Sequence, residues 1–194
     1  MLLWLSIKDF TLDAYIIKII SGFYPNDKRL YEVYSLASQK GVPVFIHSGI
    51  KALEWQRMVF NNPIIIDDIA TSFPDLRIII MHAGYPWTKE AFTVARLNKN
   101  VFLDITFLDV IDYTFEEGIL EYIVKKASKI LGASKIIWGS EGKYLKLNMY
   151  MDEGIVRIKK NLEEIITYKF LSSKEKEMVL FDNFNNLFED NFSI

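Results

Sequence analysis

The sequence predicts an α/β fold in which short parallel strands alternate with helices. Short apolar runs such as 43–46 and 77–81 are separated by stretches in which apolar residues recur at helical spacing. Hydrophobic residues make up 51% of the chain and aromatic residues 14%, which is typical of a globular protein with a packed core. With 194 residues, the chain is long enough for one domain, which we expect to span residues 1–194.

The composition also limits the partners that this chain is expected to have. Its net charge is −2 and it contains no basic block, which argues against nucleic acid. The apolar opening at residues 1–5 is soon followed by Lys8 and Asp9, so it is too short to span a membrane. The chain has no cysteine, which excludes disulfides and thiolate metal sites and suits a cytoplasmic location.

Five apolar runs are predicted to form the strands of one parallel sheet, arranged in sequential order. Each run is short, is bounded by turn residues and is separated from the next by a helical stretch, as in βαβ units. The expected strands are residues 15–20, 43–47, 77–82, 101–105 and 135–139. Five such units fit either an open doubly wound sheet or part of a (β/α)8 barrel, which needs about 250 residues when complete.

Helical spacing and capping residues place helices between these strands and after the last one. The expected helices are residues 27–40, 52–60, 64–73, 88–97, 114–131 and 152–168, followed by one that starts at 172 and one at 182–189. Asp27 can cap the first helix. Thr114 with Glu117, and Ser172 with Glu175, have the spacing of a capping box.

Three ionisable residues follow the ends of predicted strands. His47 and His82, the two histidines of the chain, each end an apolar run and precede a turn that contains glycine, and Glu141 follows a third run. The carboxyl ends of barrel strands are where catalytic and metal-binding groups lie. Two imidazoles and one carboxylate can hold a catalytic zinc or a similar divalent ion. The alternative is that all three residues are only packed within a partial barrel.

Other candidates have structural interpretations that weigh as much or more. Asp104 ends a predicted strand, where it can orient a histidine or cap the following turn. Asp67 and Asp68 are adjacent in a predicted helix, so their side chains diverge and favour a solvated face. Residues 85–87 either line a substrate pocket or pack their own loop. The basic run at 157–160 is interpreted as a solvated helix face.

A series of motifs resembles one known family. The motifs occur at residues 23–27, 42–49, 67–70, 73–76, 81–87, 100–104, 139–141 and 182–188. In this order and spacing they resemble the amidohydrolase-related family of metal-dependent (β/α)8 hydrolases and decarboxylases, from about residue 15 to residue 188. The resemblance implies an incomplete TIM barrel that begins at about the third or fourth strand of the family fold.

The resemblance also implies a role for each of the three strand-end residues. His47 matches the metal-binding histidine after strand five, and His82 matches the histidine after strand six, which binds the metal or acts as an acid–base. Glu141 stands where the family has an aspartate that binds the metal and transfers a proton, but it is longer by one methylene. The sequence also lacks the His-x-His pair of the family's first strand.

Together with the strand-end residues, the resemblance implies a metal-dependent hydrolase that acts on a small carboxylated or cyclic substrate, with decarboxylation as the neighbouring chemistry. The alternative is a catalytically degenerate member or fragment with a binding or assembly role. Open barrel edges expose unpaired backbone groups. We therefore expect an oligomer or a partner chain that covers them, or poor metal binding by the chain alone.

Overall fold

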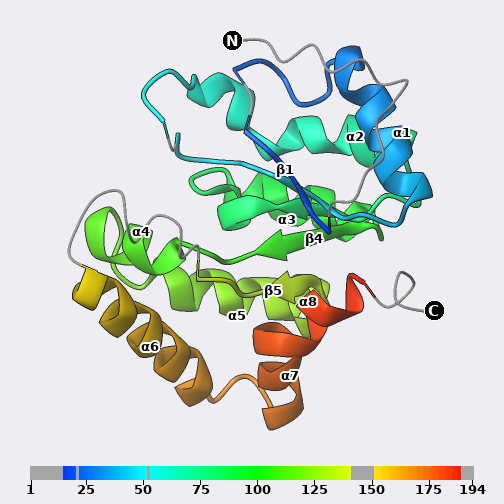
Figure 1. Cartoon of the computed structure of the whole chain (residues 1–194). Coiled ribbons are helices and arrows are strands. Elements are labelled where there is room, and N and C mark those ends of the chain that lie inside the picture. The colour runs from blue at the N-terminus through cyan, green and yellow to red at the C-terminus, as the bar shows by residue number, and fades with distance from the viewer. Residues whose placement is uncertain (1–14, 21, 52, 141–150, 189–194) are drawn as a thin grey trace.

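The computed structural model describes residues 15–20, 22–51, 53–140 and 151–188, with the side chains of 151–155 excepted. Its five strands form one parallel sheet in the order β1-β2-β3-β4-β5, which confirms the predicted topology. The strands are β1 (Ile17–Ile19), β2 (Val44–Ile46), β3 (Ile78–Ile80), β4 (Val101–Asp104) and β5 (Ile136–Ile137). Figure 1 shows the chain progressing from β1 in blue to the C-terminal helices in red.

The helices alternate with the strands and then follow β5. They are α1 (Tyr31–Gln39), α2 (Ile66–Ser72), α3 (Thr88–Leu97), α4 (Leu108–Thr114), α5 (Ile119–Leu131), α6 (Met151–Thr167), α7 (Ser173–Glu177) and α8 (Asn183–Asn186). Short 3-10 turns occupy Lys28–Leu30, Met58–Asn61, Pro63–Ile65, Met81–Gly84 and Ala133–Lys135, and a π-helical turn occupies Met178–Asp182. Among the described residues, none of the helices combines the length and the apolar character that crossing a membrane requires.

The sheet separates two hydrophobic cores. The larger core packs the helices against one face, with fully buried residues such as Ile46, Ile80 and Leu103. The smaller core lies on the other face, where Phe45 and Ile79 are register partners and Leu187 and Phe188 of the C-terminal segment cover them. Side chains alternate between faces along a strand. Every residue of β2 and β3 is buried, which explains why these strands read as continuous apolar runs.

The helix predicted at 52–60 is wrong. Leu53 to Gln56 form a turn, in which Gln56 N–H donates to the Leu53 carbonyl at 3.0 Å and the Gln56 side-chain oxygen accepts the Leu53 N–H at 2.9 Å. The side chain thus satisfies a backbone donor that a helix would have paired differently. Helical structure in this segment begins only at the 3-10 turn Met58–Asn61.

The helix predicted at 114–131 is two helices, α4 and α5, separated by a short connection. Thr114 is the last residue of α4, and its hydroxyl donates to the Val110 carbonyl at 2.6 Å, so it does not cap α5. Gly118, with φ of 80°, is the N-cap of α5 instead. The capping box of Ser172 and Glu175 at the start of α7 is confirmed in both directions.

Asn183 ties the C-terminal helices to the sheet. Its buried side-chain amide donates to the carbonyls of Ala133 and Ile136, both at 2.7 Å. We expect Asn183→Ala to lower the free energy of unfolding by about 1–3 kcal/mol, because two buried carbonyls lose their donor. Asn185→Ala, at an exposed position of the same helix, should change it by no more than about 0.5 kcal/mol. Urea denaturation compares the two variants, and equal losses would contradict the assigned role.

Candidate functional site

His47 and His82 lie side by side at the carboxyl edge of the sheet. They follow the adjacent strands β2 and β3 and are only 4% and 5% exposed. Their ring centroids are 5.1 Å apart and the ring planes meet at 71°. Two residues separated by 35 positions in the sequence are thereby brought into direct contact because parallel strands end at the same edge.

The hydrogen bond of His47 determines which of its ring nitrogens is available. Nε2 lies 2.9 Å from the carbonyl oxygen of Ile50. A carbonyl only accepts, so Nε2 carries the proton in the neutral ring and Nδ1 keeps its lone pair. Nδ1 is buried and has no hydrogen-bond partner within the described part of the chain. A buried polar atom without a partner is costly, which marks Nδ1 as a position for a ligand.

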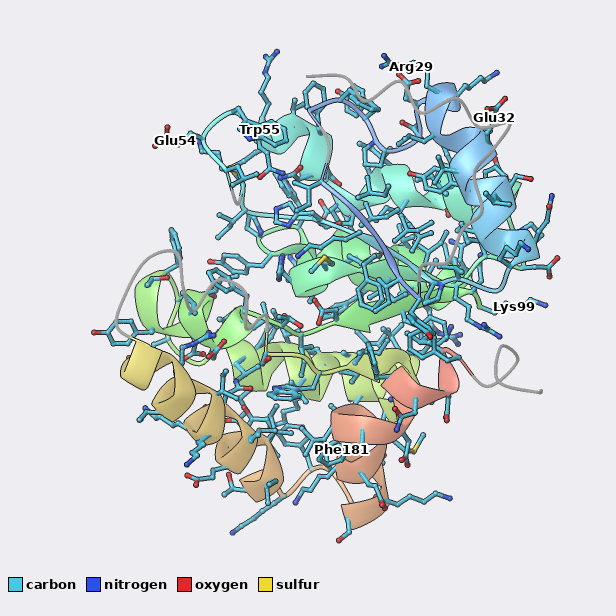
Figure 2. The ribbon with its side chains drawn as sticks, viewed as in Figure 1. Arg29, Glu32, Glu54, Trp55, Lys99 and Phe181 are labelled. Carbon is cyan, nitrogen blue, oxygen red and sulfur yellow. The ribbon has the colours of Figure 1, made fainter. Side chains whose placement is uncertain are left out.

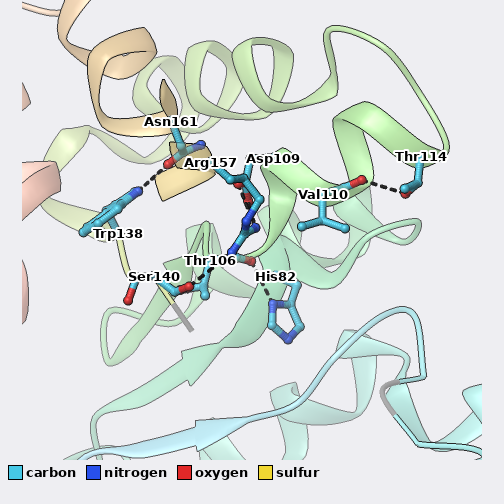
Figure 3. A network of polar contacts seen from close by, with 9 residues as sticks. All are labelled: His82, Thr106, Asp109, Val110, Thr114, Trp138, Ser140, Arg157 and Asn161. Atoms are coloured by element: carbon cyan, nitrogen blue, oxygen red, sulfur yellow. Dashed lines mark hydrogen bonds and ion pairs between the residues drawn. The ribbon is translucent and has the colours of Figure 1, made fainter. Parts of the chain in front are cut away.

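His82 has the opposite arrangement. Its Nδ1 lies 2.8 Å from the carbonyl oxygen of Thr106. Figure 3 marks this contact with a dashed line. Nδ1 therefore carries the proton in the neutral ring, and the lone pair is on Nε2. The two neighbouring imidazoles thus present a bare Nδ1 and a bare Nε2. Neutral imidazole nitrogens of this kind bind divalent metals and accept protons.

The backbone that carries His82 is left-handed. His82, Ala83 and Gly84 have φ values of 55°, 45° and 66° in succession. A left-handed conformation costs about 1–2 kcal/mol for a residue other than glycine. Two such residues in a row persist only where the surroundings hold them, and strain of this kind is often found at functional sites.

Asp104 supplies part of that support. Asp104 is 1% exposed, and one of its carboxylate oxygens accepts the His82 backbone N–H at 3.3 Å. The other oxygen accepts the Thr106 N–H at 2.9 Å and also the Thr106 hydroxyl. Asp104 therefore caps its own turn and also contacts the neighbouring histidine. Burial raises the pKa of the Asp104 carboxyl, although the nearby His82 and these hydrogen bonds act to lower it.

The loops that carry the two histidines are joined at Gly49. Its φ is +91°, and a Cβ built there would lie 2.0 Å from the Tyr85 carbonyl oxygen. The Ile50 N–H donates to the same carbonyl at 2.9 Å, and the Gly49 N–H donates to the Asn61 carbonyl at 2.8 Å. Only glycine fits this close approach of two backbones. It sets the position of the His47 loop against the His82 loop.

The surroundings of His47 favour its neutral form. Burial lowers the pKa of the His47 imidazole to about 4, and the charges of His82 and Lys18 act in the same direction, while the hydrogen bond to Ile50 opposes them. At neutral pH the ring is therefore unprotonated. Metal ligation by histidine requires this form.

The pKa of His47 predicts an acid-sensitive stability. The unfolded chain takes up a proton at about pH 6.5 and the folded chain only at about pH 4, so stability is lost as the pH falls through this window. For the protein in chelator, we expect the His47-dependent loss to approach about 3 kcal/mol. His47→Gln keeps a donor for Ile50 but does not titrate. Urea denaturation at several pH values should give wild-type and variant stabilities that diverge with pH, and parallel curves would contradict the prediction.

The third predicted ligand, Glu141, lies outside the described residues. Among the residues that the structure does describe, no group of three or more histidine, cysteine, aspartate or glutamate side chains is placed to hold a metal. Asp104 is close to His82, but its two oxygens already accept hydrogen bonds. The assignment of His47, His82 and Glu141 as metal ligands, and of His82 and Glu141 as catalytic residues, stays a prediction.

The adjacent carboxylates Asp67 and Asp68 diverge as expected. Asp67 accepts a hydrogen bond from the Asn98 amide and Asp68 from the Asn26 amide, both at 2.7 Å. Each carboxylate therefore joins α2 to a different neighbouring segment. Residues 67 and 68 are also exposed, so the pair is not a catalytic dyad.

The interpretation of 157–160 as an ordinary solvated face is wrong for Arg157. Its guanidinium contacts both oxygens of Asp109, at 2.8 and 2.7 Å, and these side chains are 28% and 15% exposed. The same guanidinium reaches the Ser140 carbonyl at 3.5 Å (Figure 3). Arg157 thus connects α6 to α4 and to the segment after β5, next to the candidate site.

Sequence reasoning missed the two carbonyls that orient the histidines. Ile50 and Thr106 act through backbone oxygens, which any residue provides, so no residue type signals them. A weak signal existed at Thr106, because Asp-x-Thr is a pattern in which the carboxylate accepts hydrogen bonds two residues on. The loop after β2 also carries Trp55, which is 58% exposed (Figure 2).

Comparison with known proteins identifies the family. The family model described as Amidohydrolase matches residues 18–187, most of the chain. The chain belongs to the amidohydrolase family. This assignment agrees with the fold and with the position of both histidines at strand ends.

Solved structures with this fold belong to chains that are longer than this amidohydrolase chain. An uncharacterised TIM-barrel protein from Bordetella bronchiseptica is 22% identical, with a TM-score of 0.70 over 91% of this chain and 58% of its own. The 5-carboxyvanillate decarboxylase LigW from Sphingomonas paucimobilis is 14% identical, with a TM-score of 0.55 over 90% of this chain and 57% of its own. The five-stranded sheet therefore corresponds to part of a TIM barrel.

A relative found by sequence comparison is also longer than this chain. Protein fluG of Emericella nidulans is 22% identical over 108 residues, which are 55% of this amidohydrolase chain and 12% of fluG. The chain thus spans a small part of that relative and just over half of the Bordetella protein.

Proposed function

We propose that this amidohydrolase is a metal-dependent hydrolase that acts on a small carboxylated or cyclic substrate. The observation that carries the proposal is the bare, buried Nδ1 of His47, next to the ring of His82. Family membership supports the same chemistry, because the family model covers residues 18–187.

His47 fits the role of a ligand to a divalent ion, with His82 beside it. Both rings are buried at one sheet edge, and each has one nitrogen held by a carbonyl and one with a lone pair. A carbonyl that accepts from the other ring nitrogen is the usual support for a metal-binding histidine. His47 would hold the ion through Nδ1, with Glu141 as the proposed carboxylate ligand.

When bound there, a divalent ion supplies Lewis acidity, which polarises a substrate carbonyl and makes water more acidic. The chain's own residues position the proton transfer. Nε2 of His82 has its lone pair available and can accept a proton from water, because Nδ1 is committed to the Thr106 carbonyl. Proton return to the leaving group from the same nitrogen would complete hydrolysis.

A degenerate, non-catalytic member is the second candidate. It is favoured by the finding that the described residues do not place a third metal-binding side chain beside the two histidines. Such a protein would keep the fold and the histidine pair without turnover, and would act through binding or assembly.

A substrate screen distinguishes the two. The protein is incubated with Zn²⁺ or Mn²⁺ and with panels of lactones, cyclic amides and aromatic carboxylates, and products including released CO₂ are measured. We expect turnover in one panel that chelator abolishes and that His82→Gln reduces by at least about 100-fold, the lower range for loss of a general acid–base. Glu32→Gln, on the exposed side of α1, should retain activity (Figure 2). Metal-loaded protein without turnover in any panel would favour the degenerate member.

A further inference from the structure

We infer that Asp104 is a positioning residue that, together with Thr106, fixes His82 in the form protonated at Nδ1, so that Nε2 faces the reaction. The inference rests on the proposed function for its consequence, but the arrangement itself can be tested without substrate or metal. Asp104 acts through His82, because its oxygens already accept hydrogen bonds from His82 and Thr106.

The Asp104 carboxylate is buried in an otherwise apolar strand. Asp104 is 1% exposed on a strand whose other residues are Val101, Phe102 and Leu103. Removing a carboxylate from water is energetically costly, and an apolar residue at this position would avoid the cost. The cost is offset by hydrogen bonds from three donors, the His82 N–H, the Thr106 N–H and the Thr106 hydroxyl. The carboxylate is thus committed to holding these two residues.

The backbone of His82 is strained. His82 and Ala83 have φ values of 55° and 45°, which persist only when surrounding contacts stabilise them. The Asp104 oxygen that accepts the His82 N–H provides such a contact at the first strained residue. The direction of the His82 Cα–Cβ bond follows from this backbone conformation. Asp104 therefore helps to set the direction in which the His82 side chain leaves the backbone.

The imidazole ring of His82 is oriented by Thr106. The Thr106 carbonyl accepts from His82 Nδ1 at 2.8 Å, and the same residue donates its N–H to Asp104. One residue thus links the carboxylate to the imidazole. Gly139, two residues after β5, lies close against Thr106, since a Cβ built there would lie 2.7 Å from the Thr106 hydroxyl oxygen. Backbone and ring of His82 are fixed from the same two residues.

Asp104→Asn separates this role from simple packing. The amide oxygen can still accept from Thr106, but the amide nitrogen then faces the His82 N–H, donor against donor. Asp109→Asn is the matched control, because Asp109 is also a largely buried carboxylate of the next helix but contacts Arg157 instead. Thr106→Val removes the hydroxyl and keeps the backbone carbonyl that holds the ring.

The readout is the ¹⁵N spectrum of the imidazole nitrogens at pH 7.5, in chelator. The chain has two histidines, so the His47→Gln variant assigns both rings. We expect wild-type His82 to be protonated at Nδ1 and His47 at Nε2. Asp104→Asn should shift His82 to a mixture of the two forms, whereas Asp109→Asn and Thr106→Val should retain the wild-type form.

Two results would overturn the inference. One is a wild-type His82 protonated at Nε2, a measurement that needs no variant to fold. The other is a folded Asp104→Asn protein in which His82 keeps the wild-type form. A protein that shows the expected spectra but no hydrolysis in the substrate screen would remove the proposed function and leave the positioning role intact.

Discussion

Gly49→Ala is expected to lower the free energy of unfolding by about 2–5 kcal/mol, the sum of about 1–2 for left-handed backbone and about 1–3 for forced repacking. The added Cβ would meet the Tyr85 carbonyl oxygen at 2.0 Å, and that backbone cannot move without displacing the turn after His82. Urea denaturation measures the loss, which is a large part of the about 5–15 kcal/mol that holds a typical domain together.

Gly118→Ala provides the control for backbone conformation alone. Gly118 has φ of +80°, but a Cβ there has no neighbouring atom within 4 Å among the described residues. Its loss should stay near about 1–2 kcal/mol. Equal losses in the two variants would show that the close approach of the two histidine loops carries no weight.

Arg157→Met is expected to lower the free energy of unfolding by about 2–4 kcal/mol, because Asp109 is left largely buried without its guanidinium. Burial already raises the pKa of the Asp109 carboxyl, and the Arg157 charge opposes that rise. Without Arg157, protonation of Asp109 becomes easier, so the loss should be smaller at acidic than at neutral pH. Denaturation at both pH values measures this.

Two further variants test whether the loss of stability comes from the ion pair between Arg157 and Asp109. Adding Asp109→Asn to Arg157→Met removes the unpaired charge and should recover part of the stability. Lys159→Met changes an exposed residue of the same helix and should have an effect within about 0.5 kcal/mol. A double variant that is as unstable as the sum of its single variants would contradict the coupling.

The sheet was predictable because its signal is local. Runs such as Val44–Ile46 and Ile78–Ile80 are buried on both faces and therefore apolar throughout, and helical stretches between them require parallel pairing. The order of the strands and the meeting of His47 with His82 follow from the same pattern. The family match over residues 18–187 agrees with the motifs that predicted it.

The errors have a different origin. The turn at Leu53–Gln56 is closed by a side chain, and the break before α5 depends on the positive φ of Gly118, neither of which apolar periodicity reports. The tautomers of the histidines depend on carbonyls of Ile50 and Thr106, which the fold supplies from elsewhere. Pairing of Arg157 with Asp109, 48 positions apart, is likewise a tertiary contact.

Calorimetric titration of the metal-stripped protein with Zn²⁺ tests the central claim, that His47 holds a divalent ion through Nδ1. We predict one ion per chain, with an affinity that falls in His47→Gln by more than the about 10–100-fold that changes around a ligand cause, and in His82→Gln by no more than that. Lys159→Met should bind like the wild type. Absence of binding by the wild-type protein, or undiminished affinity in His47→Gln, would contradict the account.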